Sequence, residues 1–532
     1  MQKHEIRLLK GLAIMVGLLA GLMLSFAMAG FPPLPFPAGF VHGAAAAAHE
    51  PLMLWGIFPG ALLAWGLAWL CQEYLFNGFE GYRYDRFIRG VRMENWHQLN
   101  SRIQAYNRKY RKRAAKQGDA PRPPVAVCRL EMPTDLETQN LLVFGTIGSG
   151  KSQAINGLVA SALARDDRMV VVDPNGSLVS RFYLPGDVIL NPYDRRCVGW
   201  SLFNEARDGF DFDRVAQSAI PPQMTESAEE WAGYGRMVLA DTMKELDRDD
   251  MQDMHTLVDL LVREQRLILQ RYLETTDSVG FFAQDADRAT ASVIFTLNKY
   301  IRPLRQIPEG DFSIRKWIAD KDGGNIWITW REDQRTALAP LIPVWIDLVF
   351  AMILSEAPSF DRRLWVFMDE LASLGRLYSF EPAVSKGRKH GLCVVGGLQD
   401  RVQLDQQLGE MAAKVALACF RNYLVLGGAN AATTRYVSEM LGQHEVERHP
   451  LGVQGNWKIN HRERRHESEA IVMPTEIANL RNLQGYLKYG QDWPLSKLRF
   501  KVRDYPVRHA PFIGAVDTAR QPFWPTRGGA RV

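Results

Sequence analysis

The stretch LLVFGTIGSGKSQAI, at residues 141–155, constrains the fold more than any other part of this sequence. It holds the pattern G-x-x-x-x-G-K-S between an apolar run at 141–144 and a run rich in Ala, Leu and Val at 153–164. Glycines let backbone N–H groups close around phosphate oxygens, because no Cβ stands in the way. The apolar run predicts a buried strand, and the second run predicts a helix whose positive end faces the phosphates. This context disfavours the alternative of a flexible glycine and serine turn, and it predicts a nucleotide-binding α/β fold.

Two side chains of this loop carry the predicted chemistry. Lys151 is expected to reach the β- and γ-phosphates, and Ser152 to place its hydroxyl on Mg²⁺. The residues predicted to bind the nucleotide are Gly145, Thr146, Gly148, Ser149, Gly150, Lys151, Ser152 and Gln153.

Hydrolysis also needs acidic groups on a neighbouring strand, and the stretch RRLWVFMDELASL supplies a pair. An apolar strand is predicted at 364–368, directly before Asp369 and Glu370. An aspartate at the end of a buried strand can orient the shell of a Mg²⁺ ion, and the glutamate beside it can polarise the attacking water. Strands that end in two exposed acids are common, so the prediction depends on the pairing with Lys151 and Ser152.

Further apolar runs with loop signals predict the rest of the sheet. They lie at 169–172 before Asp173, at 326–330, at 392–395 and at 423–426. Helical patterns lie between them, which is typical of a mostly parallel α/β sheet.

Three polar residues beside these strands are further candidates for the site. Gln399 follows the run at 392–395, where a side-chain amide could sense the γ-phosphate or position water. Arg388 lies in the basic stretch SKGRKH, and a guanidinium there could reach a neighbouring subunit's γ-phosphate. A solvated basic loop is the alternative for Arg388, and Arg421 is a second candidate for the same role.

The chain of 532 residues is too long for one ordinary core, so several domains are expected. The region from 200 to 305 is helical by its periodicity, with no convincing strand. We therefore predict an all-helical insertion that splits the nucleotide-binding domain.

Two uncharged apolar segments, at 11–31 and 52–71, each have the length that spans a bilayer as a helix. A cleaved signal peptide is the alternative for the first, because AMAG resembles a cleavage site. Residues 77–124 carry 12 Lys and Arg against 4 Asp and Glu, whereas the loop at 32–51 has no Lys or Arg. The positive-inside rule then predicts a multi-pass protein with both termini in the cytoplasm. The basic segment NRKYRKRAAK could contact nucleic acid, but membrane lipid or a topology signal is the favoured interpretation.

Cysteines and histidines point to no further chemistry. The five cysteines are scattered without a C-x-x-C pair, which favours free thiols over a disulfide framework. The histidines at 444, 449, 461 and 466 have spacings that match no usual metal site. Their polar stretch predicts a solvated hairpin or a mobile loop.

Together, the motifs of this chain resemble one family, the coupling proteins of conjugative type IV secretion systems. The resemblance covers the chain from residue 11 to about 511 and combines the two predicted spans with a series of motifs in one order. These are GTIGSGKS, VVDPNGS, LNPYDRR, EEWAGYGR, EGDFSIRKW, ITWRED, VFMDELASL, KGRKHGLCVVGGLQ and VLGGAN with LGQHEVER.

The resemblance implies a RecA-like motor domain with an inserted all-α domain, and six subunits around a channel in the bacterial inner membrane. It implies hydrolysis of ATP with Mg²⁺, coupled to translocation of single-stranded DNA, and contacts with double-stranded DNA, a relaxase and relaxosome proteins, and inner-membrane secretion components. Carried onto this chain, the resemblance implies that Lys151 holds phosphate and Ser152 holds the metal. Asp369 would then orient the metal, and Glu370 the attacking water. Gln399 would be the sensor of the γ-phosphate, and Arg388 the arginine finger donated in trans. The domain limits expected are 1–76 for the anchor, 77–124 for the basic linker, 125–199 with 306–511 for the motor, 200–305 for the all-α domain and 512–532 for the tail.

Two departures leave alternatives open. The DPNGS motif lacks the lysine of the DxKG form, and no long acidic C-terminal tail follows to dock a relaxosome protein. From the residues alone, a motor for protein effectors and a nucleotide-assembled receptor without pumping remain alternatives. An ABC transporter is disfavoured, because the chain has no LSGGQ-like signature.

Overall fold

The computed structural model describes most of the chain from residue 86 to residue 514. The ranges are 86–116, 122–264, 266–282, 287–320, 323–359, 361–428, 430–448, 452–454, 458–460 and 465–514, with residues 15, 62, 65 and 66. The chain divides into two compact units. One comprises Met1–Gly90 and Gln443–Ala470, and the other comprises Val91–Gly442 and Ile471–Val532.

The second unit is built on a ten-stranded sheet. From β11 to β7 all neighbouring strands pair in parallel, and β16 is antiparallel to both of its neighbours. The strands in spatial order are β2 (Met93–Asn95), β17 (Leu495–Arg499), β16 (Gln484–Lys488), β11 (Asn422–Leu426), β5 (Leu141–Phe144), β10 (Leu392–Leu398), β9 (Leu364–Met368), β6 (Arg168–Pro174), β8 (Ile326–Trp330) and β7 (Val188–Leu190).

The predicted mostly parallel sheet is confirmed. Strands β5, β8 and β9 have the predicted bounds, β6, β10 and β11 extend beyond theirs, and the helix after the glycine loop, α6 (Lys151–Leu163), begins two residues earlier than predicted. The short strands β2, β7, β16 and β17 were not predicted. In β17, for example, buried and exposed positions alternate over only part of five residues, which is too short a pattern to identify.

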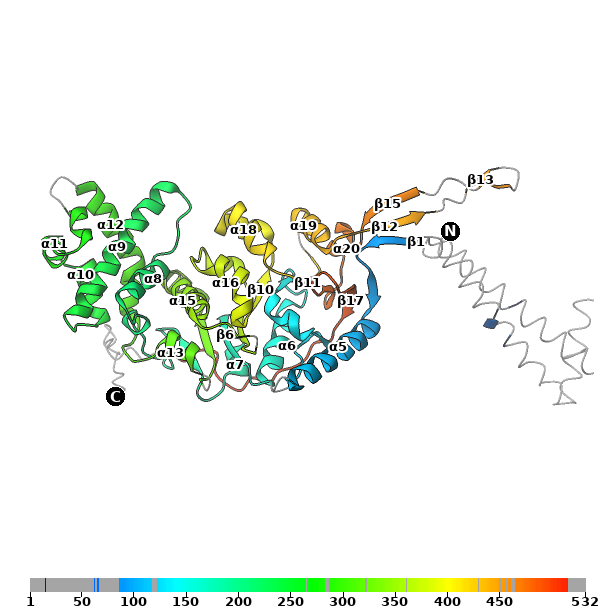
Figure 1. Cartoon of the computed structure of the whole chain (residues 1–532), viewed down its shortest axis with the longest axis horizontal. Coiled ribbons are helices and arrows are strands. Elements are labelled where there is room, and N and C mark those ends of the chain that lie inside the picture. Colours follow the sequence, from blue (N-terminus) through cyan, green and yellow to red (C-terminus); the bar gives the residue numbers. More distant parts are fainter. Residues whose placement is uncertain are drawn as a thin grey trace, which may run out of the picture. The chain divides into compact units, whose positions relative to one another are not determined.

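The central strands are apolar throughout because both faces of the sheet are covered (Figure 1). Along β5, Leu141 and Val143 join one core cluster, whereas Leu142 and Phe144 join the other, as the two-residue period of a strand requires. The first cluster includes side chains of α6 and of α5 (Trp96–Lys116). The second includes α15 (Leu341–Ser355) and α16 (Phe380–Lys386).

Among the described residues between β7 and β8, the structure has helices joined by turns and loops and no strand beyond isolated bridges, such as the one between Trp200 and Phe312. Its helices share the core cluster of α15, and α8 contacts α15, so the region packs against the helix layer that covers one face of the sheet. They are α8 (Gly209–Ala219), α9 (Glu226–Arg248), α10 (Met254–Val262), α11 (Arg266–Tyr272) and α12 (Asp287–Ile301), coloured green in Figure 1.

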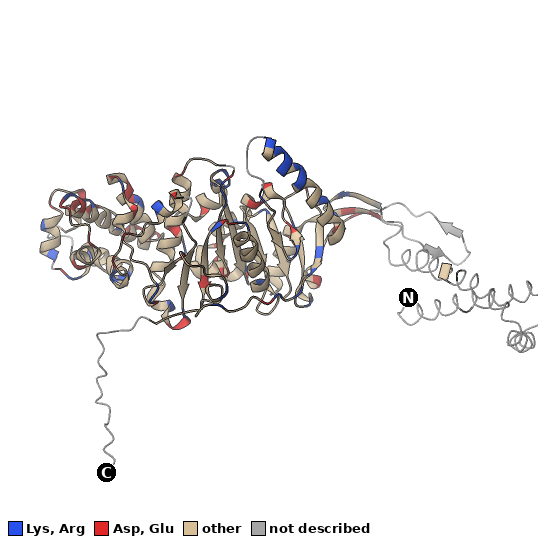
Figure 2. Cartoon of the chain, turned by 90° about the horizontal axis from the view of Figure 1, so that it is seen from below, with Lys and Arg blue, Asp and Glu red and all other residues tan. Residues whose placement is uncertain are grey.

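The basic segment forms the second half of α5, which Figure 2 shows as a blue helical end. The helix is anchored by the buried side chains Leu99 and Ile103 in its first half and Asn107 at the start of the basic segment. Asn107 donates to Met132 O at 3.1 Å, which joins the helix to the linker strand region. The basic half is therefore presented on a folded helix.

In the first unit, β12 (Gln443–Arg448) pairs antiparallel with β15 (Arg465–Ala470) and with β1 (Arg86–Gly90). Two further short strands, β13 (Gly452–Gln454) and β14 (Lys458–Asn460), pair with each other. The predicted hairpin in the histidine-containing stretch is thus present, and His444 Nε2 lies 3.1 Å from Glu469 Oε1. These residues, which the sequence analysis assigned to the motor domain, cluster with the N-terminal unit.

Among the described residues, only the helices at Glu332–Leu338 and Leu341–Ser355, bent by 68° at their junction, together have the length and apolar composition of a membrane span. Neither they nor any other described helix passes that test singly. Residues 341–353 of this pair are buried in the protein core. The spans predicted at 11–31 and 52–71 lie almost wholly outside the described residues.

Candidate functional site

The glycine loop after β5 adopts the conformation that its sequence requires. Gly148 and Gly150 have φ of +80° and +113°, in the region that residues with a Cβ rarely adopt. A Cβ on Gly150 would lie 2.9 Å from Leu483 Cδ2 and 3.0 Å from Phe500 Cζ. Ser149 is buried and its hydroxyl donates to Thr146 O at 2.7 Å, which closes the loop. The loop therefore requires glycine for its backbone conformation, and Leu483 and Phe500 leave no room for a side chain at Gly150.

Lys151 connects this loop to the acid pair after β9. Its Nζ donates to Asp369 O at 2.9 Å and to Glu370 Oε2 at 3.3 Å, and it lies 3.8 Å from Asp369 Oδ1. The lysine side chain is 8% exposed, so these contacts are made largely out of water. The two motifs lie 218 residues apart in sequence and meet because β5 and β9 flank the same strand, β10.

Gln399, at the end of that middle strand, completes the group. Its Nε2 donates to Glu370 Oε2 at 2.6 Å, and the same oxygen also accepts a hydrogen bond from Lys151 Nζ. Asp369 Oδ1 and Glu370 Oε1 are buried without a hydrogen-bond partner. Buried carboxylate oxygens without a donor are costly, and a hydrated metal ion would satisfy them. The carboxylates therefore fit a Mg²⁺–nucleotide complex.

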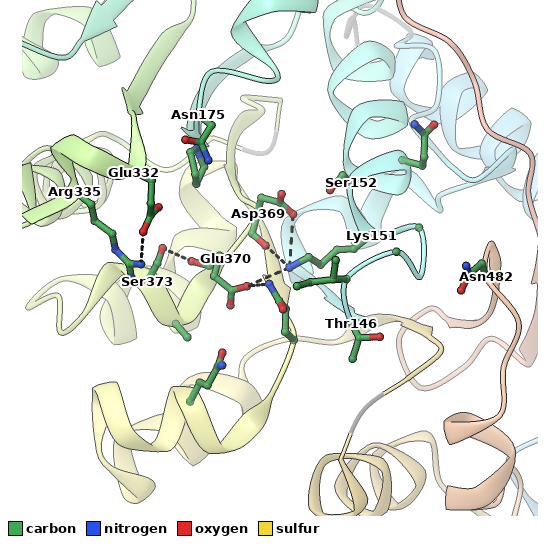
Figure 3. Close-up of a pocket in the computed structure, with 18 of the residues that line it drawn as sticks. Thr146, Lys151, Ser152, Asn175, Glu332, Arg335, Asp369, Glu370, Ser373 and Asn482 are labelled. Atoms are coloured by element: carbon green, nitrogen blue, oxygen red, sulfur yellow. Dashed lines mark hydrogen bonds and ion pairs between the residues drawn. The ribbon is translucent and has the colours of Figure 1, made fainter. Parts of the chain in front are cut away.

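These groups line a cavity of about 950 Å³, which Figure 3 shows in close-up. Six of the eight residues predicted to bind the nucleotide line it, and Gly145 and Ser149 lie behind them in the loop. The described residues of its wall are Thr146, Ile147, Gly148, Gly150, Lys151, Ser152, Gln153, Pro174, Asn175, Trp330, Glu332, Arg335, Asp369, Glu370, Ala372, Ser373, Gln399, Gln403, Gln406, Gln407, Asn482, Leu483 and Val502.

Asp173 lies behind this cavity at the end of β6 and is 1% exposed. Its Oδ2 accepts hydrogen bonds from Leu178 N and Val179 N, both at 2.7 Å, which fixes the turn of the DPNGS motif. Burial, together with the charge of Asp369, nevertheless raises the pKa of Asp173 to about 7. A carboxyl group that titrates near neutral pH therefore supports the loop that carries Asn175 into the cavity wall.

The two candidate arginine fingers lie elsewhere. Arg388 precedes β10 and Arg421 precedes β11, so both are at the amino ends of the parallel strands, opposite the glycine loop. The length of β10 separates Arg388 from Gln399 by roughly 20 Å, because a strand rises about 3.3 Å per residue. Both arginines are exposed and line a second cavity of about 840 Å³, with Arg102, Tyr106 and Trp493.

Several cavity residues were missed by sequence reasoning. Pro174 and Trp330 are the last residues of β6 and β8, and Asn175, Glu332 and Arg335 follow them. Ligands of parallel sheets bind at these strand ends, so this rule could have identified all five. Gln403, Gln406 and Gln407 share one face of α17 (Arg401–Leu408) through their helical spacing, beyond Gln399. Asn482 lies just before the unpredicted strand β16 and Val502 just after the unpredicted strand β17, and neither had a local signal.

Comparison with known proteins gives consistent matches. A family model described as type IV secretion-system coupling protein DNA-binding domain matches residues 124–501. Coupling protein TraD of Escherichia coli (strain K12) is 28% identical over 393 residues, which are 71% of this chain and 55% of TraD. The chain thus matches about half the length of that curated relative.

Among solved structures, the unbound bacterial conjugative coupling protein TrwBdeltaN70 is 40% identical, with a TM-score of 0.73, over 80% of this chain and 97% of that one. Plasmid coupling protein TrwB in complex with ADP and Mg²⁺ is 39% identical, with a TM-score of 0.72, over 81% of this chain and 98% of that one. The same protein has also been solved with a non-hydrolysable ATP analogue. The expected fold, a RecA-like nucleotide-binding domain with an inserted all-α domain, is confirmed by this similarity.

Proposed function

The chain belongs to the type IV secretion-system coupling proteins, and from this premise we propose that it is an ATPase that drives DNA transfer during conjugation. The observation that carries the proposal is that Lys151 and Gln399 both donate hydrogen bonds to the same oxygen of Glu370, Oε2. It joins a phosphate-binding cation, a water-polarising acid and an amide in one cavity. ATP and Mg²⁺ are the ligands, and TrwB binds ADP and Mg²⁺.

The proposed roles follow from the chemistry of each group. Backbone N–H groups of the glycine loop and Lys151 bind the phosphates, and Ser152 and Asp369 hold the metal. The metal ion, when bound, neutralises charge on the phosphate oxygens. Glu370 accepts a proton from the attacking water, and Gln399 orients Glu370 and that water.

The arginine finger is proposed to act between subunits. Arg388 and Arg421 lie at the edge of the sheet opposite their own chain's glycine loop, so either can serve only another copy's nucleotide. A ring of six copies places one subunit's sheet edge against the next subunit's cavity. Hydrolysis then depends on assembly, because the transition-state charge is completed by a cation from the neighbour.

We further propose the surroundings in which the motor works. The segments at 11–31 and 52–71 anchor the chain in the bacterial inner membrane, with both termini in the cytoplasm. Single-stranded DNA attached to a relaxase is the cargo, and the inner-membrane secretion components are the receiving partners. Residues 125–199 with 306–511, apart from the segment 443–470 that clusters with the N-terminal unit, form the motor, and 200–305 form the all-α domain, in keeping with the helices that lie between β7 and β8.

The test measures ATP hydrolysis by the full chain in detergent, per subunit, against protein concentration, with and without single-stranded DNA. The Lys151→Ala variant, prepared in parallel, reports contaminating activity. We expect the rate per subunit to rise with concentration and with DNA, and the DNA effect to fall with salt, as phosphate contacts require.

The opposite outcomes are equally informative. Hydrolysis that is independent of both concentration and DNA would contradict the DNA-driven ring and favour a motor for protein effectors. No hydrolysis at any DNA, salt or protein concentration would contradict the enzyme and favour a nucleotide-assembled receptor.

A further inference from the structure

Arg335 lies in the wall of the nucleotide cavity, on the side away from the glycine loop. It is the first residue of α14 (Arg335–Leu338), which follows the end of β8 through a short turn at Glu332–Gln334. In Figure 3 its side chain extends towards the cavity beyond Glu370 and Ser373, opposite Lys151. Among the described wall residues, Lys151 and Arg335 are the only lysine or arginine side chains.

The wall of this cavity carries more acidic than basic side chains, so a bound triphosphate needs a second cation beside Lys151. Three carboxylates, of Glu332, Asp369 and Glu370, line the cavity against the two cations. Lys151 is already engaged by Asp369 and Glu370. A magnesium–nucleoside triphosphate complex is itself an anion, so its outermost phosphate would meet an acidic wall unless another cation faced it.

The current partner of Arg335 is one that a phosphate can replace. Its Nη1 lies 3.3 Å from Glu332 Oε1, one helical turn away, and the two side chains are 52% and 67% exposed. Exposed ion pairs of this kind are weak, whereas phosphate oxygens accept paired hydrogen bonds from a guanidinium. The side chain can therefore exchange Glu332 for phosphate.

The backbone before Arg335 is held by a capped turn, whereas its side chain is held by the exposed pair with Glu332. Arg331 N donates to Gln334 Oε1 at 3.2 Å, which caps the turn. Arg331 itself contacts Asp333 and lies over the ring of Phe512 at 5.2 Å, and it does not line the cavity. The two arginines that flank this turn thus have different surroundings, and of the two only Arg335 lines the cavity.

Because β8 is the second strand from β9, its end lies about 10 Å from the end of β9, which Asp369 and Glu370 follow, and Arg335 comes shortly after β8. From there, the geometry points to Arg335 as a cation that binds the terminal phosphate of the nucleotide in its own chain and is held by Glu332 until that phosphate arrives. This inference rests on the proposed function and deepens it, because it assigns the distinction between triphosphate and diphosphate to a residue of the same subunit. Arg388 or Arg421 remains the cation supplied by the neighbour.

The experiment compares Arg335→Gln with the matched control Arg331→Gln in the full chain. Affinities for ADP and for the non-hydrolysable ATP analogue, both with Mg²⁺, are measured by competition against a fluorescent nucleotide. Arg335→Gln should weaken analogue binding about 10- to 100-fold, the loss expected for a hydrogen bond between charged groups, and change ADP binding less than about twofold. Arg331→Gln should leave both affinities unchanged, and Glu332→Gln should tighten analogue binding.

Each other outcome overturns the inference in a recognisable way. Equal losses for ADP and the analogue would mean a general structural effect, and unchanged affinities would mean that Arg335 does not meet the phosphate. Mixing Arg335→Gln with Lys151→Ala subunits should not restore hydrolysis, and a recovery would show that Arg335 acts on the neighbour instead. If the unaltered chain binds neither nucleotide, the proposed function itself fails.

Discussion

Gln399 donates a 2.6 Å hydrogen bond to Glu370 Oε2, the same oxygen that lies 3.3 Å from Lys151 Nζ. The other oxygen of that carboxylate, Oε1, is buried without a partner. A bound phosphate would compete with Glu370 for Lys151, and Gln399 would then be the remaining contact that orients the acid. The glycine loop is therefore linked to Glu370 through the ion pair with Lys151, which a bound phosphate could exchange.

Replacing the lysine tests that link directly. Lys151→Ala should lower hydrolysis by about 10²- to 10³-fold or more, because it removes a cation that stabilises charge in the transition state. The fold should be retained, since the lysine packs at the cavity wall. Phosphate release and circular dichroism check both points, and a rate like that of the unaltered chain would refute the site assignment.

Substitution of Gln399 by glutamate tests whether Glu370 is the group that activates water. A second carboxylate beside Glu370 disfavours its charged form, so the pH–rate profile of hydrolysis should move to higher pH by roughly one unit. The control Gln399→Leu removes the amide without adding charge and should slow hydrolysis with a smaller displacement. An identical profile for glutamate and leucine would argue against Glu370 as the base.

The placement of Arg388 predicts complementation between subunits. Arg388→Ala and Glu370→Gln chains should each be inactive alone, because one lacks the cation and the other lacks the base. Mixed rings should regain part of the activity, since some interfaces combine an intact Glu370 with an intact Arg388. Arg421→Ala is tested in the same way, and absence of recovery at every mixing ratio would exclude the arginine concerned as the finger.

The raised pKa of Asp173 predicts that the stability of the folded chain changes with pH. Because burial raises its pKa to about 7 in the folded chain, from an ordinary 3.8, the folded state holds a proton that the unfolded state has released between these values. The free energy of unfolding should therefore fall as pH rises from about 4 to about 7, by an amount on the order of a few kcal/mol, and level off above that.

The Asp173→Asn variant isolates this contribution. Its unfolding midpoints in denaturant, measured without nucleotide near pH 5 and near pH 8, should differ less than those of the unaltered chain. Equal differences in the two proteins would mean that Asp173 does not take up a proton in this range.

Two glycines of the phosphate loop predict different losses of stability. Gly148→Ala meets nothing within 4 Å, so it should cost only the strain of a left-handed residue, about 1–2 kcal/mol. Gly150→Ala adds contacts of 2.9 Å and 3.0 Å with Leu483 and Phe500, so it should cost more and also displace the loop that binds phosphate. Denaturant unfolding and nucleotide titration distinguish the two variants. Equal losses of stability would mean that Leu483 and Phe500 do not constrain the loop at Gly150.

Local pattern alone located most of the functional groups. Strands buried on both faces are continuous apolar runs, so β5, β8 and β9 could be assigned with their observed bounds. The carboxyl ends of parallel strands meet at one edge, so residues that follow different runs, such as Lys151, Glu370 and Gln399, could be expected to converge.

The sequence by itself therefore determined the parallel sheet and the chemical groups at its carboxyl edge, because these follow from short-range periodicity and motif spacing, and the ordered set of motifs carried the resemblance to the family. Only the tertiary structure decided that Asn482 and Val502 reach the same cavity, that residues 443–470 join the N-terminal unit, and that Arg388 lies at the opposite edge. Those relationships depend on strand pairing between distant segments. Such pairing is selected by the packing of the whole sheet, which no local period in the chain encodes.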